Sequence, residues 1–131
     1  MSQRAPMREP TYFVLAALLA GPLHGYAIIK RAEEMSGGRV RLATGTLYTA
    51  LDRLTAEGYV RLVSEELVAG RVRRSYGLTD EGSAALRAEA QRMAEAAQLV
   101  HAAAGVVVVH GRVRRANAGS AGGVSRKART A

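Results

Sequence analysis

The spacing of apolar residues changes from helical to strand-like at Gly58, and this change limits the folds open to the 131-residue chain. Before it, Leu47, Leu51 and Leu54 recur at spacings of four and three, which places them on one face of a helix. After it, residues 59–67 and 71–78 are rich in β-formers, and Ala69-Gly70 separates them as a hairpin turn would. The sequence therefore predicts a mainly α fold with a small β-hairpin.

Two more helices are expected before that change. Pro10 suits a helix start, and Tyr12–Ala20 predicts a largely buried helix that Gly21-Pro22 ends. A second helix is expected from His24-Gly25 to Met35, where Ser and Gly at 36–38 end it.

The third helix is expected to begin at Thr44, whose hydroxyl suits an N-cap, and residues 40–42 before it form a possible short strand. Three short helices followed by a hairpin is the order of a winged helix-turn-helix. In that architecture the third helix enters the DNA major groove, and the hairpin, or wing, reaches the flanking backbone.

A long helix is expected after the hairpin. Thr79 suits its N-cap, and Asp80 and Glu81 place negative charge in its first turn, where the helix dipole favours it. Its apolar residues recur at spacings of four and three: Leu86, Ala90, Met93, Ala97, Val100 and Ala104. A winged helix this small has little core left for such a seam, so we expect a second copy of the chain to cover it. The domains predicted are a DNA-binding domain at 10–78, a dimerisation helix at 79–104 and a flexible basic tail at 105–131.

The net charge of +8 is concentrated at the C-terminus. Residues 1–111 hold 13 Lys and Arg against 11 acids, whereas residues 112–131 hold six Lys and Arg and no acid. Such a tail adds non-specific affinity for DNA or is a solvated extension, and the sequence does not decide between them.

The longest apolar run is too short to span a membrane. Arg4 and Arg8 before it could mimic a signal peptide, but Pro10 and the helical pattern resuming at His24 favour a buried helix. The absence of cysteine fits a reducing compartment. We therefore expect a cytoplasmic protein with no membrane partner.

Three segments together resemble the PadR family of bacterial transcriptional regulators. They are Gly21–Tyr26, residues 45–58 with Leu47-Tyr48 and Glu57-Gly58, and residues 71–82 through the wing and its exit. The resemblance implies a winged-helix homodimer, joined largely through its C-terminal helix, that binds palindromic operators. It also implies a repressor that small aromatic or cationic effectors release.

The chain departs from the family pattern in two places. Thr49 stands where the family usually has proline, which restores a backbone donor and adds a hydroxyl to the exposed strip of the third helix. The C-terminal helix has no tryptophan, which some relatives use to bind flat drugs, so that kind of pocket is not expected here.

The candidate DNA-binding residues come from the second helix, the third helix and the wing. They are Tyr26 and Lys30; Thr44, Thr46, Tyr48, Thr49 and Arg53; and Arg71, Arg73 and Arg74. Hydroxyl and guanidinium groups on such elements contact phosphates and base edges. The alternatives are a solvated helix face, a half-buried Tyr48, and a charged strand edge that discourages pairing.

Nothing in the sequence indicates catalysis or a cofactor. The three histidines lack metal-ligand spacing and there is no cysteine, so we expect no metal. No serine lies in a nucleophile motif, and the C-terminal glycines lack the lysine of a phosphate-binding loop. Two other functions stay open on this fold: a protein-interaction adaptor, and a non-specific basic DNA-binding protein.

Overall fold

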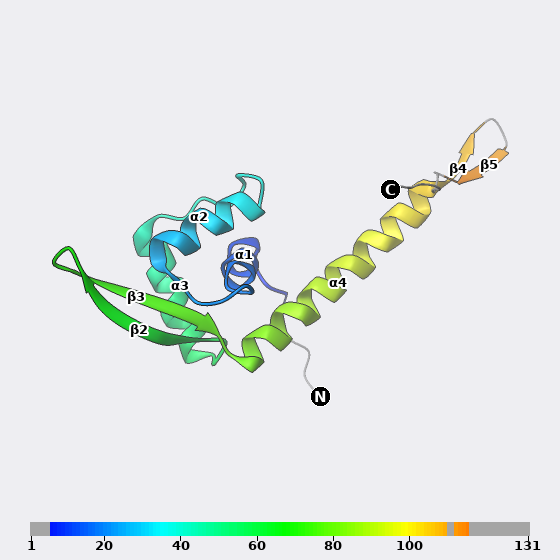
Figure 1. Cartoon of the computed structure of the whole chain (residues 1–131). Helices are drawn as coiled ribbons and strands as arrows, with labels where there is room; N and C mark the ends of the chain where they lie inside the picture. The colour runs from blue at the N-terminus through cyan, green and yellow to red at the C-terminus, as the bar shows by residue number, and fades with distance from the viewer. Residues whose placement is uncertain (1–5, 110–111, 116–131) are drawn as a thin grey trace, which may run out of the picture. The chain divides into compact units, whose positions relative to one another are not determined.

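The computed structural model describes residues 6–109 and 112–115 (Figure 1). The chain divides into two compact units, residues 1–90 and residues 91–131. The first unit contains three helices, a small antiparallel sheet and the beginning of a fourth helix. The second contains the remainder of that helix and a short hairpin.

Three helices build the core of the first unit: α1 (Glu9–Ala17), α2 (Gly25–Met35) and α3 (Thr44–Ala56). Pro10 lies in the first turn of α1, as the sequence predicted, although the helix begins and ends about three residues earlier than expected. The core is made of side chains that are at most 3% exposed, from all three helices and from β2 and α4: Val14, Leu15, Leu18, Ile28, Leu47, Leu51, Leu54, Val60 and Leu86. The predicted leucine face of the third helix is therefore confirmed as its buried face.

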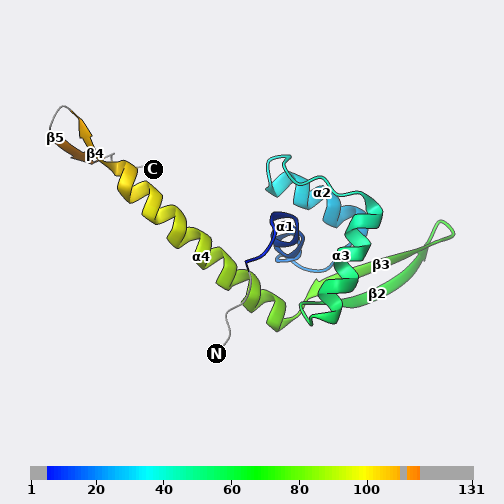
Figure 2. The same cartoon turned by 180° about the vertical axis from the view of Figure 1, so that it is seen from behind.

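The sheet has the strand order β1-β3-β2 and is antiparallel throughout. Figure 2 shows β2 and β3 side by side. Strands β2 (Val60–Val68) and β3 (Arg71–Leu78) form the predicted hairpin, with the turn at Ala69-Gly70. Strand β1 (Leu23–His24) pairs with Tyr76 and Ser75 of β3. The sequence did not predict β1, because two residues carry no periodicity.

The strand considered at residues 40–42 does not form. The buried Ser36 hydroxyl instead accepts a hydrogen bond from the backbone N–H of Val40 at 2.9 Å. This bond fixes the path of the loop between α2 and α3. Thr44 is also not the N-cap of α3: Ala43 occupies that position, and Thr44 is the first helical residue.

Two glycines of the family-like segments permit close packing. A Cβ atom on Gly25 would collide with the hydroxyl of Tyr48, and a Cβ on Gly82 would collide with the backbone oxygen of Tyr59. The first contact joins α2 to α3, and the second joins the start of α4 to the segment before β2. Both glycines therefore serve the fold.

Helix α4 (Asp80–Gly105) begins as predicted. The backbone N–H of Gly82 donates to the Thr79 hydroxyl at 2.9 Å, which is the expected cap. Ala85, Leu86 and Glu89 are buried within the first unit. The assignment of Leu86 to a dimer seam therefore needs correction, because the core of its own chain already covers this side chain.

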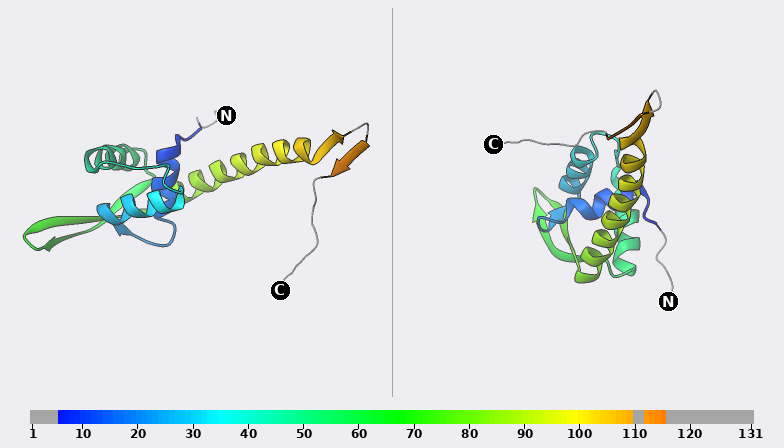
Figure 3. Two further views of the ribbon diagram at one scale, coloured as in Figure 1. Left: turned by 90° about the horizontal axis from the view of Figure 1, so that it is seen from above. Right: turned by 90° about the vertical axis from the view of Figure 1, so that its right-hand side faces the viewer.

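In the second unit, every side chain of α4 from 91 to 104 is exposed. The helix is followed by β4 (Val106–Val109) and β5 (Arg112–Arg115), which pair as an antiparallel hairpin (Figure 3). Residues 106–109, which the sequence analysis placed in the tail, form a strand. The predicted tail from 105 thus contains these eight strand residues, and its residues 110–111 and those from 116 lie outside the described residues.

Within the described ranges, no helix combines the length and apolarity needed to cross a membrane.

Candidate nucleic-acid interface

The outward face of α3 carries small and polar side chains. Four of its residues are exposed: Thr44, Gly45, Thr46 and Thr49. By contrast, Leu47 and Leu51 of the same helix are fully buried. Helical geometry directs residues 45 and 49 to the same side, about opposite the leucines. This face is short and free of bulky side chains, so another molecule can approach the helix closely.

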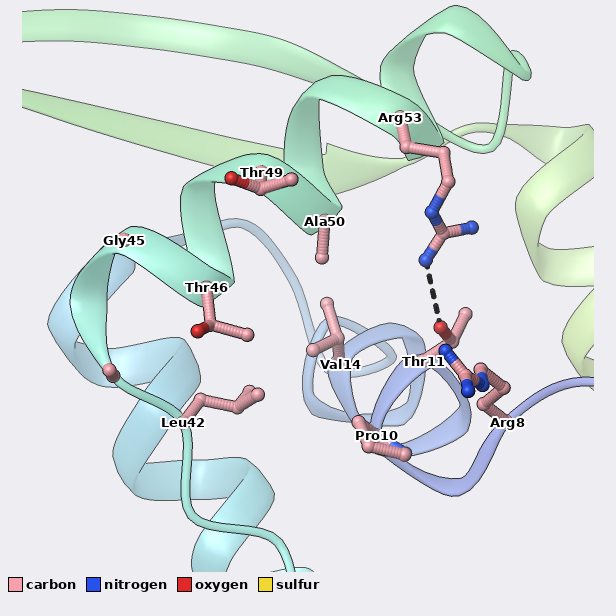
Figure 4. Close-up of a pocket in the computed structure, with 11 residues that line it drawn as sticks. Arg8, Pro10, Thr11, Val14, Leu42, Gly45, Thr46, Thr49, Ala50 and Arg53 are labelled. Carbon is pink, nitrogen blue, oxygen red and sulfur yellow. Dashed lines mark hydrogen bonds between the residues drawn. The ribbon is translucent and has the colours of Figure 1, made fainter.

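Arg53 extends from α3 toward α1 (Figure 4). Its Nη2 donates to the hydroxyl of the buried Thr11 at 3.0 Å, and its Nη1 lies 3.6 Å from a carboxylate oxygen of Glu57. The side chain stays about half exposed, at 48%. Arg53 therefore helps to hold α3 against α1, a role that its sequence position did not predict.

Tyr48 lies on the other flank of α3, where it packs against the core. Its ring centroid is 6.4 Å from that of Tyr76 on β3, and its hydroxyl lies over Gly25. Burial raises the pKa of Tyr76 above its ordinary value, and Arg74 opposes that rise. The packing supports the structural interpretation of Tyr48, with its hydroxyl directed to the first residue of α2.

The wing divides its three arginines between two faces. Cross-strand partners share a face and successive residues alternate, so Arg71 and Arg73 lie on one face with Arg74 on the other. The Nε of Arg74 donates to a carboxylate oxygen of Glu65 at 2.6 Å, and this hydrogen bond raises the pKa of Arg74. Of the three, Arg71 and Arg73 are the arginines best placed to meet a polyanion together.

The same division of faces leaves an apolar pair near the wing tip. Leu67 and Val72 are direct cross-strand partners, and they are 75% and 58% exposed. They share the face of Arg74. The wing thus has one face with two arginines, on which Glu66 is the cross-strand partner of Arg73, and one face with an ion pair and an apolar tip.

Tyr26 and Lys30 lie one turn apart on α2 and are both exposed. They border an open hollow of about 470 Å³ together with Glu33 and Glu34. The two acids reduce the positive potential there, so this pair is a weaker candidate for backbone contacts than the wing.

A pocket of about 900 Å³, called here the α1–α3 pocket, opens beside the outward face of α3. Figure 4 shows its lining, which comes from the start of α1, the loop before α3, and α3 itself. Its described lining residues are Arg8, Pro10, Thr11, Val14, Leu42, Ala43, Gly45, Thr46, Thr49, Ala50 and Arg53. Arg8 and Thr11 were not among the candidate residues, because only the packing of α1 against α3 brings them to this face.

Comparison with known proteins decides the family. The model of the transcriptional regulator PadR-like family matches residues 14–88, which is more than half of the chain. The chain belongs to the PadR-like family. The predicted winged helix-turn-helix fold is thus confirmed, with four helices and a three-stranded antiparallel sheet in the described residues, and members of this family are transcriptional regulators and not enzymes.

Two curated relatives are each similar to part of this PadR-like chain. The transcriptional regulator Rv3488 of Mycobacterium tuberculosis is 44% identical over 69 residues, 52% of this chain and 63% of its own length. An uncharacterized 37.1 kDa protein in transposon TN4556 of Streptomyces fradiae is 48% identical over 81 residues, 62% of this chain and 22% of its own. The chain therefore spans less than two thirds of each of these relatives.

Solved structures of PadR-type proteins share the fold. The crystal structure of Bacillus subtilis PadR in complex with operator DNA has 28% identity and a TM-score of 0.54, covering 61% of this chain and 45% of that one. A PadR family transcription regulator from Clostridium difficile has 26% identity and a TM-score of 0.59, covering 71% of this chain and 95% of that one.

Proposed function

We propose that this PadR-like protein is a sequence-specific DNA-binding repressor, which occupies a pseudo-palindromic operator as a homodimer. The observation that carries the proposal is the outward face of α3, which is exposed and free of bulky groups in a fold similar to that of an operator-bound PadR. The proposal places each α3 in a major groove, with half-sites about 34–36 Å apart or at a multiple of that spacing.

Within that face, Thr49 and Thr46 are the proposed base-reading residues. Threonine hydroxyls pair with either kind of base edge, and the methyl group contacts thymine. Gly45 lets the backbone approach the groove, and Thr44 is available for a phosphate because it does not cap the helix. Arg53 is proposed to hold α3 against α1 through Thr11 and, because its pair with Glu57 is half exposed and worth little, to contact a phosphate as well.

The wing supplies affinity without sequence preference in this proposal. Arg71 and Arg73 share one exposed face and contact phosphates, while Arg74 pairs with Glu65 on the other. Tyr26 and Lys30 of α2 add backbone contacts across the groove. The exposure of these four residues, and the charge of Arg71, Arg73 and Lys30, support their proposed role as backbone contacts.

The homodimer is proposed to form through the exposed part of α4. Met93 and Val100 are 47% and 66% exposed in the single chain, and Ala97 lies between them on the same face. Apolar side chains in such number along one helix favour a partner helix. Ala90, half-buried at the start of the seam, marks where the intramolecular core ends.

Repression follows from occupancy of the operator, which blocks access of RNA polymerase in the bacterial cytoplasm. Release requires an effector that binds the DNA-free form in preference to the DNA-bound form, because a ligand with equal affinity for both shifts nothing.

The test is selection of bound sequences from random DNA with the purified protein, followed by mobility shifts with the enriched sequence. We expect one palindrome to be enriched. The protein should bind this palindrome more tightly than unrelated sequences by a factor of about 10³ or more. Uniform binding governed only by salt would identify a non-specific DNA-binding protein instead. Absence of binding, with a stable complex to another protein, would identify an adaptor.

A further inference from the structure

The α1–α3 pocket has the size and lining of a small-molecule site. Its volume of about 900 Å³ lies within the range of roughly 300–1,000 Å³ that such sites occupy. Pro10, Val14, Leu42 and Ala50 line it with apolar groups, and Val14 is itself fully buried. Three threonines add hydroxyls around this apolar floor: Thr11, Thr46 and Thr49.

The charge of the lining is positive at one end. Arg8 and Arg53 lie at the same end of the pocket as Thr11 (Figure 4), and none of the eleven described lining residues is acidic. Arg53 has Glu57 as a counterion at 3.6 Å, in a pair whose side chains are about half exposed. Such an exposed pair is worth little, so a better-placed anion replaces it easily.

A guanidinium group offers paired N–H donors whose geometry matches a carboxylate. An anion at the arginine end would place its remaining atoms over Val14 and Ala50, and a ligand reaching the other end would cover Thr46 and Thr49. The pocket and the proposed base-reading face therefore share two side chains.

We propose that the α1–α3 pocket binds a small organic carboxylate with a compact apolar body, and that this ligand competes directly with DNA for α3. The carboxylate pairs with Arg8 and Arg53, and the apolar body contacts Pro10, Val14 and Ala50. The competition rests on the proposed DNA-binding function, whereas the binding of the carboxylate does not.

A ligand that competes directly with DNA differs from one that acts through a dimer interface. The difference lies in the number of ligands bound per protomer and in how the affinity for DNA depends on ligand concentration. Each protomer binds one ligand by itself. The apparent dissociation constant for DNA increases as one plus the ratio of free ligand to its own dissociation constant, with no change of conformation required.

The test uses the full chain, cyclohexanecarboxylate as probe and cyclohexanecarboxamide as its neutral counterpart of the same shape. Titration followed by amide NMR is expected to give saturable shifts at Thr46, Thr49 and Ala50 with the carboxylate. Binding of the amide should be weaker by about tenfold or more, which corresponds to about 1.4 kcal/mol for the missing charge.

Variants separate charge from shape. Arg8→Gln removes one guanidinium and leaves the Thr11–Arg53 bond intact, and Ala50→Leu reduces the free volume and leaves both arginines. Each should weaken carboxylate binding severalfold. Arg61→Gln, an equal charge change on exposed β2 outside the pocket lining, should leave it unchanged.

The outcomes distinguish this inference from the proposed function. Absence of saturable shifts with the carboxylate, or equal binding of the amide, overturns the carboxylate site, while operator binding measured without ligand still decides the function. Saturable binding that does not displace operator DNA overturns the competition. Ligand binding that displaces operator DNA, with both effects weakened severalfold together in Arg8→Gln, supports both.

Discussion

Helices α3 and α4 obey the same spacing rule but bury their apolar residues differently. All three leucines of α3 are fully buried within one chain, whereas the buried residues of α4 end at Glu89 and the side chains from 91 to 104 are exposed. Periodicity identifies the apolar face of a helix; it does not identify what covers that face. On α3 the face left over is polar and suits DNA, while on α4 it is apolar and suits a second chain.

The largest expected effect comes from removing a leucine of α3. Leu51→Ala should lower the free energy of unfolding by about 2–5 kcal/mol, because the side chain is fully buried and leaves a cavity. Leu99→Ala on α4 is the matched control, and as an exposed residue away from the core it should change stability by about 0.5 kcal/mol or less. Urea unfolding at low protein concentration measures both, and equal reductions in stability would contradict the contrast between the two helices.

The exposed part of α4 is tested by the double variant Met93→Glu, Val100→Glu. The two glutamates on each chain would bury four carboxylates in the helix pair, which is strongly unfavourable, so the variant should be monomeric and should bind a two-half-site operator at least about tenfold more weakly. Light scattering gives the mass, and circular dichroism checks that the fold is kept. A dimer mass in the variant would exclude this seam as the interface.

The first unit was largely predictable because its elements carry strong local signals. The hairpin turn at Ala69-Gly70, the cap at Thr79 and the leucine face of α3 all follow from residues close in sequence. Strand β1 and the burial of Leu86 depend on packing between distant segments, which no local pattern encodes. The same reason explains why Arg8 and Thr11 were not expected beside α3, and why the contact of Tyr48 with Gly25 was not predicted.

The wing separates affinity from sequence preference. Replacing both Arg71 and Arg73 by alanine should weaken binding to all sequences alike and reduce the log–log salt slope by up to about 1.8, near 0.9 for each phosphate that is no longer neutralised. Arg74→Ala is the control on the opposite face, where Glu65 already engages the side chain, and its effect should be smaller. Fluorescence anisotropy over a salt series measures both, and an unchanged slope in the double variant would remove the wing from the interface.

The smallest expected effect concerns the contact between α1 and α3. Thr11→Val removes the hydroxyl that accepts from Arg53 and preserves the shape of the side chain, so stability should fall by about 0.5–1.5 kcal/mol. Thr55→Val, whose hydroxyl donates only to the Leu51 carbonyl of its own helix, is the control and should change stability less. Thermal unfolding compares the two, and a Thr11 variant as stable as the parent would show that this hydrogen bond does not hold the helices together.

The central claim is that the outward face of α3 reads DNA sequence. Selection from random DNA with the parent protein and with Thr49→Ala tests it most directly, with the Arg71→Ala, Arg73→Ala variant run in parallel. The account predicts one palindrome for the parent, a changed preference at one symmetric position in both half-sites for Thr49→Ala, and the parental palindrome at reduced affinity for the wing variant. Recovery of the identical palindrome by Thr49→Ala, with the same discrimination at every position, would contradict it.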